Sequence, residues 1–229
     1  MPSLTCIPDQ VQVVWFISGL AVINRLDFAR RLIDATQGSL DGDPVVLPLP
    51  EDAPNEIPII ILRSKDDKLQ VNISRTRVDF LAREARARSA DSTLALSHER
   101  LAEIGAILRS TGSAITRHAL VTVWSAEPEK GGARYVIDNY LQPDPLVRNA
   151  ANAEMHIFHR VDIANVSSNR WVRLQSVSSP SDALLTKLAV VVDINSSTEK
   201  PQDFDARLSS DFLSSATAHT TEIIRGLRS

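Results

Sequence analysis

The chain has 229 residues, a net charge of -3, and 43% hydrophobic and 23% charged residues. This composition excludes a wholly disordered chain, because it supplies enough apolar surface for a core. The slight acidity gives no overall attraction to nucleic acid or to an anionic membrane. The single cysteine, Cys6, excludes an intrachain disulfide and a cysteine-based zinc site. The longest apolar run, 11–23, is shorter than the ~20 residues of a membrane-spanning helix, so we expect a cytoplasmic protein without membrane contact.

Apolar periodicity and turn residues predict strands and helices along the whole chain. In chain order, these are a strand over 10–22, a helix between the caps Asn24 and Gly38, strands over 57–62, 68–73 and 77–81, a helix over 97–111, strands over 114–125, 154–163, 170–177 and 184–194, and a helix over 202–227. Few helices and consecutive hairpins predict an α+β fold, a mainly antiparallel sheet with two shorter helices and a long C-terminal helix. We expect a single domain over 1–229, and a division into degenerate β-α-β-β halves, 1–125 and 126–229, stays open.

Some segments between these elements have less regular patterns. The stretch 126–153 predicts irregular structure with one short β piece at 134–137. The polar run 165–169 predicts a turn between the strands that flank it. Within the strand that follows, Trp171, Leu174 and Val177 do not alternate regularly, which predicts a bulge. The apolar run 184–194 predicts a central strand.

Three long segments carry a resemblance to a known family. They are IPIIILRSKDDKLQVNISRTRVDF, ERLAEIGAILRSTGSAITRHALVTVW and LAVVVDINSSTEKPQDFDARLSSDFLSSATAHTTEIIRGL. In their order and spacing the chain resembles a sporadically distributed prokaryotic family of uncharacterised proteins. The resemblance implies a strand–helix–hairpin layout closed by a long helix, and a bacterial or phage setting that includes defence systems. It supplies no catalytic residues.

The stretch Lys68–Phe80 changes the alternation of its apolar residues. They occupy odd positions as far as Ile73 and even positions from Val78. We expect a bulge or tight break near Ser74–Thr76 that returns the apolar residues to the core and points the arginines outward.

A basic stretch begins at this break. Its five arginines, set against Asp79 and Glu84, give a local charge of +3; they are Arg75, Arg77, Arg83, Arg86 and Arg88. The arginine fork suits carboxylate and phosphate groups, which favours an anion- or partner-binding face. The alternative is a solvated edge strand that arginine protects against unwanted pairing.

Familiar catalytic patterns do not occur in the sequence. His156 and His159 would point to opposite faces of a strand, so they do not form a metal pair. The sequence contains neither the nucleophile elbow G-x-S-x-G nor the dinucleotide fingerprint G-x-G-x-x-G. We therefore expect no cofactor and no metal.

Three functions remain open. The first is a non-catalytic protein-interaction module, either a homo-oligomer or a subunit of a bacterial or phage complex. The second is a protein that binds an anion, a ligand or nucleic acid through Arg75–Arg88, for which interleaved aromatic residues would be the supporting sign. The third is an enzyme of unrecognised type.

Overall fold

The protein is built around one antiparallel sheet. The structure, a computed structural model, describes residues 4–20, 24–50, 52–83, 101–141, 144–147, 150–179, 182–200 and 202–227. The strands within these ranges are β1 (Ile7–Ile17), β2 (Val45–Val46), β3 (Ile60–Arg63), β4 (Leu69–Ile73), β5 (Arg77–Arg83), β6 (Ile115–Ala126), β7 (Glu154–Ile163), β8 (Val166–Ser179) and β9 (Asp182–Ser196). They form a nine-stranded sheet in the order β2-β3-β4-β5-β1-β6-β9-β8-β7. The predicted α+β class is confirmed, and the run 184–194 lies in β9, an internal strand as expected.

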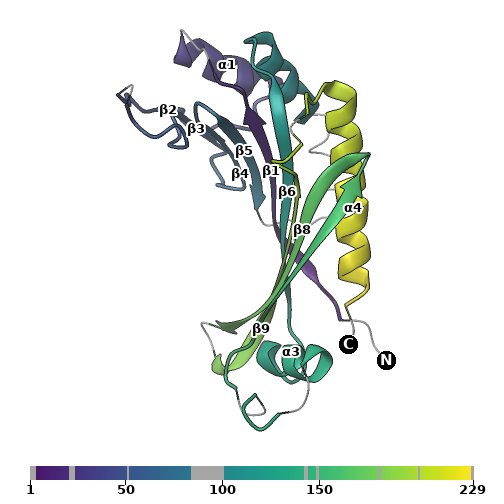
Figure 1. Cartoon of the computed structure of the whole chain (residues 1–229). Helices are drawn as coiled ribbons and strands as arrows, with labels where there is room; N and C mark the ends of the chain where they lie inside the picture. The colour runs from purple at the N-terminus through teal and green to yellow at the C-terminus, as the bar shows by residue number, and fades with distance from the viewer. Residues whose placement is uncertain are drawn as a thin grey trace.

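The described residues contain four helices, where two shorter helices and one long helix were expected. They are α1 (Arg25–Ala35), a helix that includes 101–110, α3 (Gly132–Tyr140) and α4 (Ala206–Arg225). Figure 1 shows α4 lying along the sheet, with α1 and α3 towards opposite ends. The start predicted for the second helix, near Ser97, lies outside the described residues. In the part of the chain that the structure describes, no helix combines the length and the hydropathy needed to cross a bilayer.

Side chains cap two of these helices, one of them as the sequence predicts. The Asn24 side chain accepts a hydrogen bond from the backbone N–H of Asp27 at 3.1 Å, as predicted for the start of α1. Asp205 accepts from the N–H of Leu208 at 2.7 Å at the start of α4. Each oxygen satisfies one of the backbone donors that a helix leaves unpaired in its first turn.

The two faces of the sheet differ. On β1 the side chains of Val11, Val13, Trp15 and Ile17 enter the core cluster together with residues of the helices. Every strand residue of that cluster comes from the same face, which we call the covered face. The opposite side chains of the strands make up what we call the open face, and none of them belongs to the core cluster of the described residues.

The change of alternation after Ile73 is a turn between two strands. The backbone N–H and the hydroxyl of Ser74 both donate to the carbonyl of Arg77, at 2.8 and 3.0 Å. Ile73 then pairs with Val78, so β4 and β5 form a hairpin. The expected tight break is confirmed at this position, and the alternative of a bulge within one strand is wrong, because the chain reverses direction.

The β piece predicted at 134–137 is wrong, because the segment belongs to α3. Ala133, Val136 and Ile137 are buried on one side of this helix. Gly131 has a φ of +83°, and a Cβ on Gly132 would collide with the backbone carbonyl of Lys187. The helix therefore starts directly against β9, and this packing outweighs the strand preference of its valine, isoleucine and tyrosine residues.

The predicted turn between β7 and β8 is confirmed, but its extent over 165–169 and the predicted bulge in β8 are wrong. The turn contains only Ala164 and Asn165, both with positive φ, while Val166 already pairs with Ile163. β8 pairs with β9 without a register shift until Ser178. Trp171 and Val177 are exposed because they alternate on to the open face, whereas Leu174 belongs to the covered face.

Candidate functional site

The arginines of the predicted basic stretch do not form one site. Arg75 lies in the turn between β4 and β5, and its guanidinium donates to the carbonyls of Ala53 at 2.9 Å and Pro50 at 2.8 Å. Its side chain thus holds the proline-rich loop against the hairpin. Arg86 and Arg88 lie outside the described residues.

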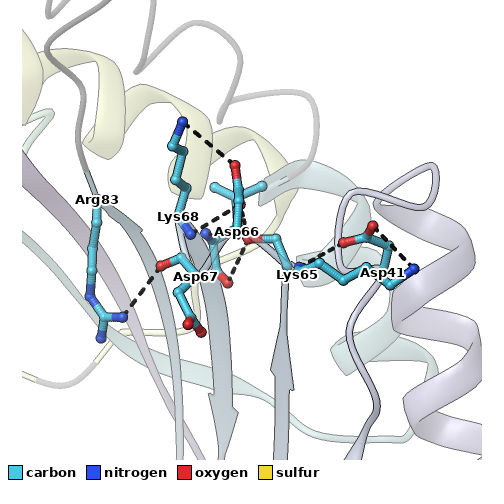
Figure 2. A network of polar contacts seen from close by, with 8 residues as sticks. Asp41, Lys65, Asp66, Asp67, Lys68 and Arg83 are labelled. Carbon is cyan, nitrogen blue, oxygen red and sulfur yellow. Dashed lines mark hydrogen bonds and ion pairs between the residues drawn. The ribbon is translucent and has the colours of Figure 1, made fainter.

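Arg77 and Arg83 have separate local partners on β5. Arg77 donates through Nε and Nη2 to one oxygen of Asp79, at 2.9 and 2.6 Å. Arg83 donates to the side chain of Gln70 at 3.1 Å and to the carbonyl of Asp67 at 3.5 Å, where it supports the β3–β4 turn (Figure 2). Arg75 and Arg83 therefore stabilise different loops, whereas Arg77 pairs within β5 and also lies over the ring of Phe16 on β1.

Two arginines and one aromatic ring form a cluster around Phe16 in the middle of the open face. Phe16 pairs with Arg77 of β5 and with Arg117 of β6. Both guanidinium carbons lie over its ring, at 5.5 and 4.4 Å from the centroid. Partial burial lowers the pKa of Arg117, and the nearby Asp193 carboxylate opposes that shift. Arginine stays charged under these conditions, so the open face carries two cations held in place by an aromatic ring.

A second aromatic group lies on the open face at the edge of the sheet. Phe158 of β7 and Trp171 of β8 are cross-strand partners, and their ring centroids are 4.6 Å apart at an interplanar angle of 43°. Both side chains are 44% exposed. Large aromatic rings are usually buried, and a contacting pair this exposed marks a surface suited to a flat ligand.

A groove of about 310 Å³ runs beside Trp171. Its lining includes His156, Arg173 and Asp193, which offer donors and acceptors around the indole. Glu154 lies at its rim, where one carboxylate oxygen is 2.6 Å from Nε2 of His156 and 3.6 Å from Nε of Arg173. The groove thus combines an apolar floor with charged walls.

Two acidic side chains of this face, Asp79 and Asp193, are hydrogen-bonded within it. Asp79 accepts hydrogen bonds from Gln12 at 2.8 Å and from Arg77. Asp193 accepts from the side chain of Asn195 at 3.0 Å. These two carboxylates lie beside Arg77 and Arg117 and offset their positive charges.

The covered face holds a different kind of group, a buried histidine. His118 is enclosed by the rings of Trp15, Phe204 and Phe212. Its Nε2 lies 3.0 Å from the hydroxyl of Ser209. Burial, and then the charge of Arg109, lower the pKa of His118 to about 3, so the imidazole is neutral at pH 7.

The cavity near this histidine is too small for a substrate. It measures about 40 Å³ and is lined by Arg109 and Ser209, among others. One water molecule occupies ~30 Å³ of liquid volume, so a space of this size accommodates little more. The contact between His118 and Ser209 therefore serves packing, and we place the candidate site on the open face.

The described residues contain neither a cluster of metal ligands nor a reactive thiol. His156 and His159 lie on opposite sides of β7, and no cluster of three or more metal-ligating side chains occurs within the described ranges. Burial raises the pKa of the Cys6 thiol to about 11, which keeps it protonated and unreactive at neutral pH.

Comparisons with known proteins leave the function open. No family model and no curated protein matches this chain. It is similar to Methanococcus jannaschii TBP, with 13% identity over 97% of both chains and a TM-score of 0.32. It is also similar to the regulatory subunit of aspartate kinase from Thermus flavus, with 10% identity over 96% of this chain, 97% of the other and a TM-score of 0.26. Both TM-scores are too low to bear on fold or function.

Proposed function

We propose that the protein is a non-catalytic binding protein that holds a single strand of nucleic acid on the open face of its sheet. The observation that carries the proposal is the exposed pair of Phe158 and Trp171 beside a groove with a charged lining. Bases in a single strand are free to stack on aromatic side chains, and each stack contributes ~1–3 kcal/mol whatever the base. Sheets that present aromatic rings to solvent are a recurrent platform for this contact.

Arginines beside the rings supply the second half of the expected chemistry. Arg173 lines the groove, and Arg77 and Arg117 lie over Phe16 farther along the same face. A guanidinium can donate two parallel hydrogen bonds to a phosphate while its plane stacks on a ring or a base. A strand running from Trp171 towards Phe16 would therefore meet alternating stacking and phosphate contacts.

This proposal keeps the expected binding of an anion but assigns it to the open face instead of the stretch Arg75–Arg88. The sequence places the arginines of 75–88 together but provides no exposed aromatic residue among them. The sheet register brings aromatic rings from β1, β7 and β8 on to the face that Arg77 shares. A bacterial or phage setting and a cytoplasmic location belong to the same proposal.

A protein-interaction module or complex subunit is the second candidate. It is favoured by the outer edge of β7, which no strand among the described residues covers. Such an edge offers backbone donors and acceptors to another chain.

Fluorescence anisotropy with labelled oligonucleotides tests the proposed function. We expect single strands to bind more tightly than duplexes of the same length. Affinity should fall with salt, because each phosphate contact to a single strand contributes about −0.7 to the slope of log K against log salt. Trp171→Ala and Arg173→Ala should each weaken binding about tenfold, the loss that follows from removing one stack or one charged contact.

Matched substitutions elsewhere provide the controls. Leu26→Ala removes an exposed apolar side chain from α1, and Arg207→Ala removes a side chain on α4 that is 90% exposed. Both variants should keep the wild-type affinity. Equal losses in the controls, or no binding of any oligonucleotide, would refute the proposal.

The tryptophans give an independent signal. Of the three in the chain, Trp15 and Trp124 are buried and Trp171 is exposed. Quenching of tryptophan emission by a bound strand should therefore come from Trp171 and disappear in Trp171→Phe. Quenching that persists in this variant would place the ligand elsewhere.

A further inference from the structure

The two edges of the sheet are unequal. One edge strand, β2, has two residues and lies between Pro44 and Pro48, so it offers few backbone groups. The other, β7, has ten residues and pairs with β8 over all of them. Its sequence EMHIFHRVDI contains no proline, glycine or lysine, and its register shows no bulge. The backbone devices that prevent edge pairing, proline and bulges, are therefore absent from β7, and the charged side chains of Glu154, Arg160 and Asp162 decide which partner the edge accepts.

The turn before β8 determines which backbone groups of β7 point outward. Both turn residues have positive φ, the signature of a two-residue type I′ hairpin, in which the flanking residues Ile163 and Val166 exchange hydrogen bonds. Alternation along an antiparallel ladder then directs the N–H and C=O groups of Ile157 inward. Those of His156, Phe158 and Arg160 point away from β8, and no strand among the described residues pairs with them.

We propose that β7 pairs antiparallel with β7 of a second copy of this chain, about a two-fold axis at Ile157. In this register His156 lies opposite Phe158 of the partner subunit, and Glu154 lies opposite Arg160 of the partner subunit. In this register, each residue whose backbone N–H and C=O groups point outward lies opposite another such residue, as continuous pairing requires. The two-fold axis repeats the Glu–Arg contact on its other side, which makes the edge complementary to itself.

Charge distinguishes this register from its neighbours. Pairing about Phe158 would place Glu154 opposite Asp162 of the partner subunit on both sides of the axis, which opposes like charges. Pairing about His159 would place Phe158 opposite the partner's Arg160, and its contact between His156 and the partner's Asp162 would be ionic only with a protonated imidazole. Opposite charges directly across an antiparallel pair stabilise it and like charges destabilise it.

The ion pairs that Glu154 and Arg160 form within one chain do not prevent this pairing with a second copy. Arg160 pairs with Glu199 at 2.7 Å, and both side chains are mostly exposed. Glu154 pairs with His156 and Arg173 at the rim of the groove. Exposed ion pairs contribute little to stability, so they can give way to contacts across the two-fold axis.

Pairing of this kind joins the two sheets and their open faces into one surface. Phe158 of one copy then lies about one strand spacing, ~4.8 Å, from His156 of the partner subunit. The aromatic pairs of both copies flank the axis. This consequence rests on the proposed function, because it doubles the platform available to a nucleic-acid strand, whereas the dimer itself does not depend on it.

Sedimentation equilibrium without nucleic acid tests the dimer. We expect a species of twice 25.2 kDa that dissociates on dilution. Arg160→Glu and Glu154→Arg should each weaken dimerisation at least tenfold, because each places like charges opposite one another. The double variant Glu154→Arg with Arg160→Glu should restore it. Arg207→Glu, on α4, serves as the charge-reversal control and should leave the dimer unchanged.

Amide hydrogen exchange gives a second readout that does not depend on any variant. The N–H groups of His156, Phe158 and Arg160 should become protected as the protein concentration rises, while that of Ile157 stays protected throughout. A monomer at every concentration would overturn the proposal, and so would a double variant that remains as weak as its parents. A monomer that still binds oligonucleotides would overturn the dimer alone, whereas a dimer that binds none would overturn only the proposed function.

Discussion

Arg117 and His118 are neighbours on β6 and belong to opposite faces of the sheet. His118 is fully buried among aromatic rings on the covered face, where burial holds its imidazole neutral. Arg117 lies over Phe16 on the open face and keeps its charge in partial contact with solvent. One step along a strand thus separates a residue that serves packing from one that can serve recognition.

The contrast between these two residues extends to the two faces as a whole. The covered face joins residues of the sheet and the helices into one apolar cluster. The open face places aromatic rings and arginines where a ligand can reach them, and two of its carboxylates, Asp79 and Asp193, are hydrogen-bonded to neighbouring side chains. Stability should therefore respond mainly to changes on the covered face, and binding to changes on the open face.

The largest effect is expected from Phe212→Ala on the covered face. Phe212 is 0% exposed and contacts both His118 and Phe204. Removing a buried ring loses its transfer free energy and leaves a cavity, at a cost of ~3–5 kcal/mol in the free energy of unfolding. Urea denaturation followed by circular dichroism measures the loss. A change below ~1 kcal/mol would mean that α4 does not pack tightly on the sheet.

Most strands could be predicted from the sequence because their apolar and polar residues alternate. Hairpin residues such as Val71 and Ile73 have the regular spacing that burial on one face imposes. α3 was missed because its Tyr-Val-Ile core has strand propensity, and the contact that decides its conformation, Gly132 against Lys187, joins distant segments. No local pattern contains that contact.

The candidate site was missed for a related reason. Phe158 and Trp171 are partners only because the turn consists of Ala164 and Asn165 alone. A turn spread over 165–169, as the polar run suggests, removes this register. Asn165 was the available signal, since asparagine readily adopts the positive φ of a two-residue hairpin turn. The arginines of 75–88 were grouped by sequence distance, although a hairpin turn places Arg75 and Arg77 in different surroundings.

An intermediate effect is expected from pH acting through His118. Its pKa is about 3 in the folded protein and 6.5 in the unfolded chain, so the unfolded chain takes up the proton first as pH falls. Its contribution to stability is therefore complete above pH 6.5 and is lost towards pH 3. The maximum slope is about 1.4 kcal/mol per pH unit. Measuring unfolding free energies from pH 7 to pH 4 should show a shallower slope for His118→Gln than for wild type.

His159→Gln is the matched control for this prediction. His159 is exposed on β7, outside the aromatic cluster. This variant should keep the full wild-type slope, because the slope is assigned to the buried imidazole of His118. Identical slopes for wild type and His118→Gln would show that carboxylates, rather than this histidine, govern acid sensitivity.

The smallest effect on stability is expected from Phe158→Ala, the same substitution as in Phe212 but on the open face. Phe158 is 44% exposed, so only about half of its transfer free energy is realised in the folded protein. We expect a loss of about 1 kcal/mol or less in the unfolding free energy. A double-mutant cycle with Trp171→Ala should give a coupling of ~0.5–1.5 kcal/mol, the range for a contacting aromatic pair. Both variants should nevertheless weaken oligonucleotide binding, because a ring that contributes little to folding remains available for stacking. A stability loss as large as that of Phe212→Ala would mean that Phe158 belongs to a buried interface. The open face would then not be the surface that binds nucleic acid.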